Sequence, residues 1–196
     1  NILAERAQAA FTEKSLSDAA LGLCAALAAA EHGDARRALD LLRVAGEVAE
    51  RKGLTVVSEE HVREAEKHIE HNRVVEALSN LPLHSKLVTL SIYHLGKRDA
   101  RGAITGEISE VYEELSGELG VAPLTQRRLS TLINELDAMG LLNARVVSMG
   151  RYGRTKKIRL EIGRSLIRDV FAEDSRLSRL VNYEVQCISK RADGRN

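Results

Sequence analysis

The spacing of apolar residues limits this 196-residue chain to a few folds. They recur every three or four residues along most of the chain, as in helices that bury one face. Between residues 142 and 162 the period changes to two, as in half-buried strands. The alternating apolar residues there are Leu142, Ala144 and Val146, then Ile158, Leu160 and Ile162. The pattern predicts a mainly α protein with a two-stranded β-hairpin.

The first half of the chain reads as a small helical bundle. Helix starts are predicted where side chains can accept hydrogen bonds from free backbone N–H groups, at residues 15–18, at Asp34 and at residues 58–60. Helix ends are predicted at Gly33, Gly53 and Pro82. Residues 55–57 form a short extended link in this prediction.

The second half predicts three helices followed by the hairpin. The helices cover residues 85–95, the segment around 108–119, and residues 126–139, the last capped by Thr125. The third helix has an apolar stripe and an opposite polar face. The stripe is Leu129, Leu132, Ile133 and Leu136, and the polar face is Arg127, Ser130, Thr131 and Asn134.

Three helices, a strand, a hairpin tip and a second strand follow the order of a winged helix-turn-helix. We therefore predict a helical bundle over residues 1–81 and a winged helix over 82–165. Residues 166–196 are predicted as a helical extension that packs back onto the winged helix or, alternatively, forms a self-association surface. We expect residues 189–196 to fray.

The near-neutral net charge of +1 conceals an uneven distribution. Residues 1–82 carry 10 basic and 14 acidic side chains, whereas residues 83–196 carry 19 basic and 14 acidic ones. Six cations and no acid lie between residues 138 and 160. Such a run indicates either a solvated face or a surface for a polyanion.

The predicted hairpin tip favours the polyanion. Two glycines make the tip flexible, and Arg151 and Arg154 flank Tyr152 on it. A phosphate track or a minor groove would satisfy this arrangement, which predicts binding to DNA. The alternative is a winged helix that contacts proteins and pairs its wing arginines with acids.

Two adjacent arginines in the first half also lack an obvious partner. Asp34 is placed to cap a helix whose first turn contains Arg36 and Arg37. Cations are unfavourable at this end, because the helix dipole is already positive there. The pair therefore either meets an anion or is solvated beside Asp34 or Asp40.

The run GDARRALDLLR, residues 33–43, resembles the sensor-2 motif in the helical lid of AAA+ ATPases. The resemblance implies that Arg36 reaches the γ-phosphate of ATP held by a neighbouring α/β domain. The 196 residues contain neither a GxxxxGK[ST] loop nor a Walker B segment, so we expect them to have no enzymatic activity. ATP or ADP with Mg²⁺ is implied for a longer protein, and no cofactor is expected for these residues alone.

Three further segments resemble the C-terminal winged helix of archaeal origin-recognition initiators, the relatives of eukaryotic origin-recognition and cell-division-control proteins. They read LPLHSKLVTLSI, LTQRRLSTLINELDAMGLL and GRYGRTKKIRL. With the lid motif, the resemblance covers about residues 1–165. It implies a recognition helix in the major groove of origin DNA and a wing in the minor groove. Those roles fall on Gln126, Arg127, Arg128, Ser130 and Thr131 in the helix, and on Arg151, Tyr152, Gly153 and Arg154 in the wing.

The resemblance implies double-stranded origin DNA as the partner, together with other initiator subunits and the replicative helicase, in the nucleoid of an archaeal cytoplasm. No apolar run approaches the 18 residues of a membrane span, so no membrane is expected. Two alternatives remain: a module that holds initiator or helicase subunits, and a winged-helix transcription regulator whose first half dimerises. The GDARR motif argues against the regulator.

Other candidate chemistry is sparse. His61, His68 and His71 share a helix face, but we expect them to be solvated and predict no metal site. No Ser/His/Asp or Cys/His pattern suggests catalysis, and Cys24 and Cys187 lack metal-binding spacing. The chain starts without Met or a basic signal-peptide region, and we interpret this start as a cut edge.

Overall fold

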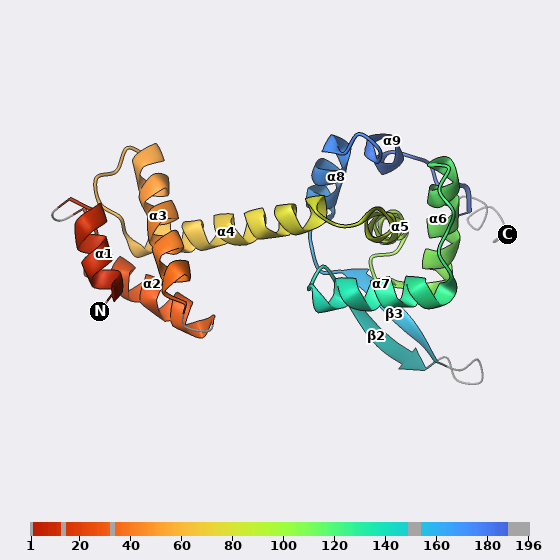
Figure 1. The fold of residues 1–196 in the computed structure, drawn as a ribbon, viewed down its shortest axis with the longest axis horizontal. Helices are drawn as coiled ribbons and strands as arrows, with labels where there is room; N and C mark the ends of the chain where they lie inside the picture. The colour runs from red at the N-terminus through yellow and green to blue at the C-terminus, as the bar shows by residue number, and fades with distance from the viewer. Residues whose placement is uncertain (1, 13–14, 32–33, 149–153, 188–196) are drawn as a thin grey trace. The chain divides into compact units, whose positions relative to one another are not determined.

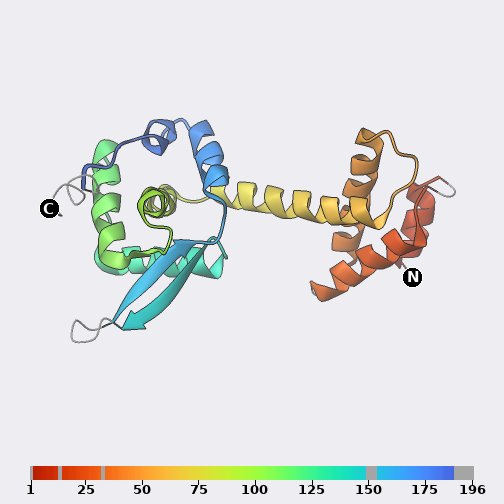
Figure 2. The ribbon, with the colours of Figure 1, turned by 180° about the vertical axis from the view of Figure 1, so that it is seen from behind.

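The structure, a computed structural model, describes residues 2–12, 15–31, 34–148 and 154–187 (Figure 1). The chain divides into two compact units, residues 1–73 and 74–196. The first is helical, and the second combines helices with one antiparallel sheet (Figure 2). This confirms the predicted fold class, a helical bundle followed by a winged helix.

The first unit consists of α1 (Ile2–Ala10), α2 (Asp18–Ala30), α3 (Ala35–Arg51) and most of α4 (Glu59–Ser79). Two of the three predicted caps are present. The Ser17 side chain accepts the Ala20 N–H at 3.2 Å, and Asp34 Oδ1 accepts the Arg36 N–H at 2.9 Å. Each cap satisfies a backbone donor that its helix cannot.

Small residues dominate the core of this unit. Ala20, Cys24, Ala45 and Ala65 are fully buried there, which lets the helices approach closely. Burial raises the pKa of the Cys24 thiol to about 11, so this thiol stays protonated and unreactive at neutral pH. The predicted link at residues 55–57 supplies Val57, which forms a parallel β-bridge with Leu16.

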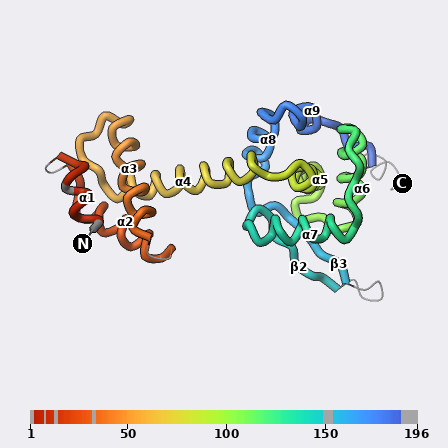
Figure 3. The backbone as a smooth tube through the Cα atoms, viewed as in Figure 1, coloured from red at the N-terminus to blue at the C-terminus, as the bar shows by residue number. Residues whose placement is uncertain are grey.

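The second unit contains a winged helix. Its elements are the end of α4, α5 (Leu83–Arg98), β1 (Ala103–Ile104), α6 (Thr105–Glu118), α7 (Gln126–Ala138), β2 (Leu142–Ser148), β3 (Arg154–Leu160), α8 (Arg164–Glu173) and α9 (Ser178–Val181). Helix α5 is buried along residues 85–95, as its apolar residues on several sides predict. The backbone trace in Figure 3 shows α6, α7, α8 and α9 arranged around α5.

The sheet has the order β1-β3-β2, so the predicted hairpin gains a third strand. Leu142 pairs with Leu160 and Ala144 with Ile158. Ile158 is fully buried, as its alternation predicts. Strand β3 already begins at Arg154 and ends at Leu160, so Ile162 lies beyond it.

A glycine turn and a side-chain hydrogen bond hold helix α7 against the hairpin. It ends before Gly140, whose φ of +72° is the left-handed conformation that glycine adopts most readily. Asp137 Oδ1 then accepts the backbone N–H of Ala144 in β2 at 3.0 Å. The polar face of α7 is thereby held in a defined position relative to the wing.

The segment after the wing packs back onto the winged helix, which is the first of the two predicted alternatives. Phe171 of α8 is fully buried in the same core as α5. Lys86 Nζ of α5 lies 2.7 Å from Asp174 Oδ2, and His94 Nε2 lies 2.9 Å from the carbonyl oxygen of Leu180. The expected fraying at residues 189–196 lies outside the described residues.

Candidate nucleic-acid interface

Helix α7 has a buried apolar face and an exposed polar face, as predicted. Its four stripe residues, Leu129, Leu132, Ile133 and Leu136, are at most 4% exposed. Arg127 and Asn134 are exposed on the other side, with the half-buried hydroxyls of Ser130 and Thr131 between them. These side-chain types can contact base edges and phosphates.

The three residues at the start of α7 differ in how they are engaged. Gln126 donates its Nε2 to Ser109 Oγ of α6, which ties the helix to its neighbour. Arg128 Nη1 lies 3.5 Å from Glu135 Oε1. Within the described part of the chain, the Arg127 side chain forms neither an ion pair nor a hydrogen bond, so its guanidinium is free for an external anion.

The wing continues the polar face of α7. Lys156 of β3 donates its Nζ to Asn134 Oδ1 of α7, and across the hairpin it faces Val146, which is 62% exposed. Lys156 is absent from the set of DNA-binding residues that the resemblance implies. Its place in the cation run is visible in the sequence, but its contact with Asn134 depends on the strand register.

Of the four predicted wing residues, the structure describes only Arg154. Arg154 is exposed and forms the first residue of β3, opposite Ser148, rather than part of a flexible tip. Arg151, Tyr152 and Gly153 lie outside the described residues.

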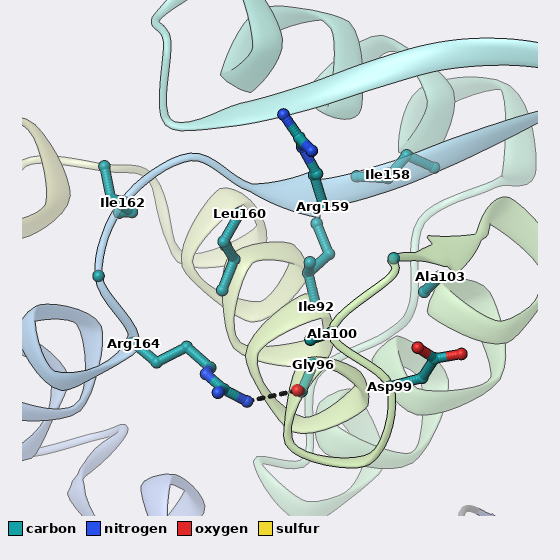
Figure 4. Close-up of a pocket in the computed structure, with 12 residues that line it drawn as sticks. Ile92, Gly96, Asp99, Ala100, Ala103, Ile158, Arg159, Leu160, Ile162 and Arg164 are labelled. Carbon is teal, nitrogen blue, oxygen red and sulfur yellow. Dashed lines mark hydrogen bonds between the residues drawn. The ribbon is translucent and has the colours of Figure 1, made fainter.

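A separate pocket of about 300 Å³ lies among α5, β1, β3 and the start of α8 (Figure 4). Arg164 donates a hydrogen bond to the Gly96 carbonyl at its edge. The carboxylate in its lining, Asp99, accepts hydrogen bonds from Arg101 Nε and Nη2 at 2.9–3.2 Å. These bonds lower the pKa of Asp99 to about 2, so Asp99 is a paired anion rather than a proton donor.

The two lid arginines have different environments. Arg37 is only 6% exposed, and its Nε and Nη2 lie 3.0 Å and 2.9 Å from Glu31 Oε2 and Glu70 Oε1. Arg37 thus meets anions within the unit and is neither solvated nor paired with Asp34 or Asp40. Arg36 is exposed, and its side chain makes no ion pair with any described residue.

The histidine prediction is wrong in part. His61 is only 5% exposed, and its Nδ1 accepts the backbone N–H of Ser58 at 3.0 Å, because the start of α4 turns the ring inward. His68 and His71 are exposed as expected. Among the described residues, no group of three or more His, Cys, Asp or Glu could hold a metal ion. In that same part of the chain, no helix combines the length and apolar character that a membrane crossing requires.

Two protein families match the two units. Residues 1–67 match the Cdc6 AAA+ ATPase-type lid domain, and residues 76–170 match the CDC6 C-terminal winged helix domain. Together these matches cover most of the chain.

Archaeal relatives agree with this assignment. The chain is 51% identical over 185 residues to an ORC1-type DNA replication protein of Thermococcus kodakarensis, covering 94% of this chain and 45% of the relative. It is 50% identical over 192 residues to an ORC1-type DNA replication protein 1 of Methanosarcina mazei, covering 97% and 46%. The chain thus spans about half the length of these curated relatives.

A solved structure gives the same assignment. The ORC1 protein of Aeropyrum pernix, solved in complex with DNA, is 50% identical, with a TM-score of 0.80 over 91% of this chain and 47% of that one. Both family matches and the relatives therefore place this chain in the ORC1/Cdc6-type family of DNA replication initiators.

Proposed function

We propose that this chain is the origin-binding part of a replication initiator, with α7 in the major groove of duplex DNA and the wing in the adjacent minor groove. The observation that carries the proposal is the exposed polar face of α7, where the free Arg127 lies on the same surface as Lys156 of the wing. The 50% identical relative solved in complex with DNA supports it.

The side chains have two roles in this proposal, and Arg127 takes part in both. Arg127, Ser130 and Thr131 read base edges, because they lie on the exposed side of a helix narrow enough for the major groove. Five cations contact phosphates or the minor groove: Arg127, Arg128, Arg151, Arg154 and Lys156. Gln126 positions α7 against α6 through Ser109.

A salt titration tests the contact with phosphates. Five such contacts predict that the logarithm of the association constant falls with the logarithm of the salt concentration with a slope of about −4 to −5. We would measure this slope by fluorescence anisotropy on a labelled duplex. Lys156→Gln should make the slope shallower by about 0.9. The matched control is Arg168→Gln, because this exposed arginine lies on α8 and pairs with Asp169.

Binding that does not depend on salt would refute the proposed mechanism. An equal effect of Arg168→Gln would show that the contacts are not confined to α7 and the wing.

For the lid, we propose that Arg36 senses ATP bound to an ATPase domain in the full-length protein. Its exposed side chain at the start of α3, without an ion pair in the described part of the chain, supports this role. Arg36→Ala in the full-length protein should weaken ATP binding or hydrolysis in the presence of Mg²⁺. The control is Arg43→Ala on the same helix, where Arg43 pairs with Glu47. Equal nucleotide affinity and turnover in wild type and Arg36→Ala would contradict the proposal.

A further inference from the structure

The sheet of the winged helix has a second basic surface on the side turned away from the core. Side chains alternate between the two faces of a strand. Ile158 and its neighbours on one face pack on the helices, which leaves Asn143, Arg145, Lys157 and Arg159 on the other, here called the outer sheet face. Figure 4 shows Leu160 directed toward α5 and Arg159 extending away from it.

Two like charges face each other directly on the outer sheet face. The strand register pairs Arg145 of β2 with Lys157 of β3, and both side chains are exposed. Directly opposed cations on neighbouring strands repel each other and destabilise the sheet. An anion between them would remove this cost.

Two acids of this region are already engaged by other arginines. Glu161 Oε1 lies 2.9 Å from Arg159 Nη2, and Asp99 binds Arg101 through both carboxylate oxygens. Lys157 also lowers the pKa of Asp99, but its effect is smaller than that of the hydrogen bonds from Arg101. Within the described residues, neither Arg145 nor Lys157 has an ion pair or a hydrogen-bonded side chain.

The chemistry of the outer sheet face favours phosphates over a protein partner. Protein interfaces centre on apolar and aromatic anchors. Of the large apolar side chains exposed in the described chain, Leu54 and Val56 belong to the first unit, Met139 follows α7, and Val146 lies on the opposite face of the sheet. Val147 also lies on the outer sheet face by this register, but it is partly buried. Among the described residues, the outer sheet face thus offers exposed cations and no exposed apolar anchor, which is typical of contact with a nucleic-acid backbone.

We propose that Arg145 and Lys157 bind the phosphates of duplex DNA flanking the base pairs that α7 reads. The inference rests on the proposed function. Because the outer sheet face points away from α7, these phosphates do not belong to the groove that α7 occupies. Flanking DNA reaches them by bending past the wing, and the added contacts offset the energy of the bend.

The length of the duplex separates this surface from the α7 interface. We would compare the affinity of wild type and an Arg145→Gln/Lys157→Gln variant on two duplexes. One is no longer than the footprint of α7 and the wing, and the other extends it by about two helical turns on each side. On the long duplex, the variant should lose on the order of ten-fold in affinity and about 1.8 from the salt slope. On the short duplex it should match wild type.

The control variant, Arg168→Gln/Arg176→Gln, removes two exposed arginines of the same unit and should match wild type on both duplexes. The Arg145→Gln/Lys157→Gln variant should also melt at the same or a higher temperature than wild type, since it removes a repulsion.

Equal losses on both duplexes would assign the pair to the α7 groove and overturn the inference, as would no loss on either. An acidic protein that binds wild type but not the variant, with DNA affinity unchanged, would overturn it in favour of a protein partner. If wild type binds neither duplex, the proposed function itself fails.

Discussion

His94 makes the stability of the winged helix depend on pH. The ring is 5% exposed in α5, and its Nε2 lies 2.9 Å from the carbonyl oxygen of Leu180 in α9. Burial lowers the pKa of His94 from 6.5 to about 4, against a smaller opposing effect of the bond to Leu180. Lys97 lowers this pKa further, and Glu114 raises it.

The sign and size of the effect follow from proton linkage. Between pH 6.5 and about pH 4 the unfolded chain takes up a proton on His94 and the folded chain does not. Unfolding is therefore favoured as the pH falls through this window, and the contribution of His94 is fully present above it. The lowering of the pKa corresponds to about 3 kcal/mol of stability lost across the window.

Urea unfolding at several pH values between about 7 and about 4.5 would measure this loss. Wild type should lose more stability over this range than His94→Gln, which keeps an N–H donor for Leu180 but does not titrate. His68→Gln, at an exposed histidine, should behave as wild type. Parallel curves for wild type and His94→Gln would refute the reasoning, because carboxylates elsewhere titrate equally in both proteins.

Two substitutions in the second unit test the packing around the interface. Lys86→Met leaves the partly buried Asp174 without its partner at 2.7 Å and should cost about 1–3 kcal/mol in urea unfolding. Lys86→Met/Asp174→Leu should recover most of this loss, and equal stability of the two variants would contradict the pairing. Gly102→Ala puts a Cβ 2.8 Å from the Ile158 carbonyl oxygen at a φ of +104° and should cost about 1–3 kcal/mol. Gly117→Ala, in open space on α6, should cost nothing, and a loss there as large as at Gly102 would count against the steric argument.

The features that are predicted correctly from the sequence are those that depend on local chemistry. The Asp34 and Thr125 caps, the split faces of α7 and the alternation in the hairpin each depend on residues a few positions apart. The helix-strand order follows from them. Strand β1 escapes prediction because two residues show no period, and Ala103 becomes part of a strand only through pairing with Ile158.

Contacts between segments that are distant in the sequence limit how much of the site can be predicted from the sequence. Lys156 joins the interface through Asn134, 22 positions away, and Arg37 pairs with Glu70, 33 positions away, and with Glu31, rather than with Asp34 or Asp40. Spacing along the chain contains no signal for these pairings.

The central claim is that α7 reads bases while the wing holds the backbone. Selection of binding sites from a random duplex pool tests it most directly, with wild type, Arg127→Ala and Arg154→Ala compared at one salt concentration. The account predicts that Arg127→Ala selects a sequence altered at a few neighbouring positions, and that Arg154→Ala selects the wild-type sequence with lower affinity. The same selected sequence from all three proteins would contradict base reading by α7.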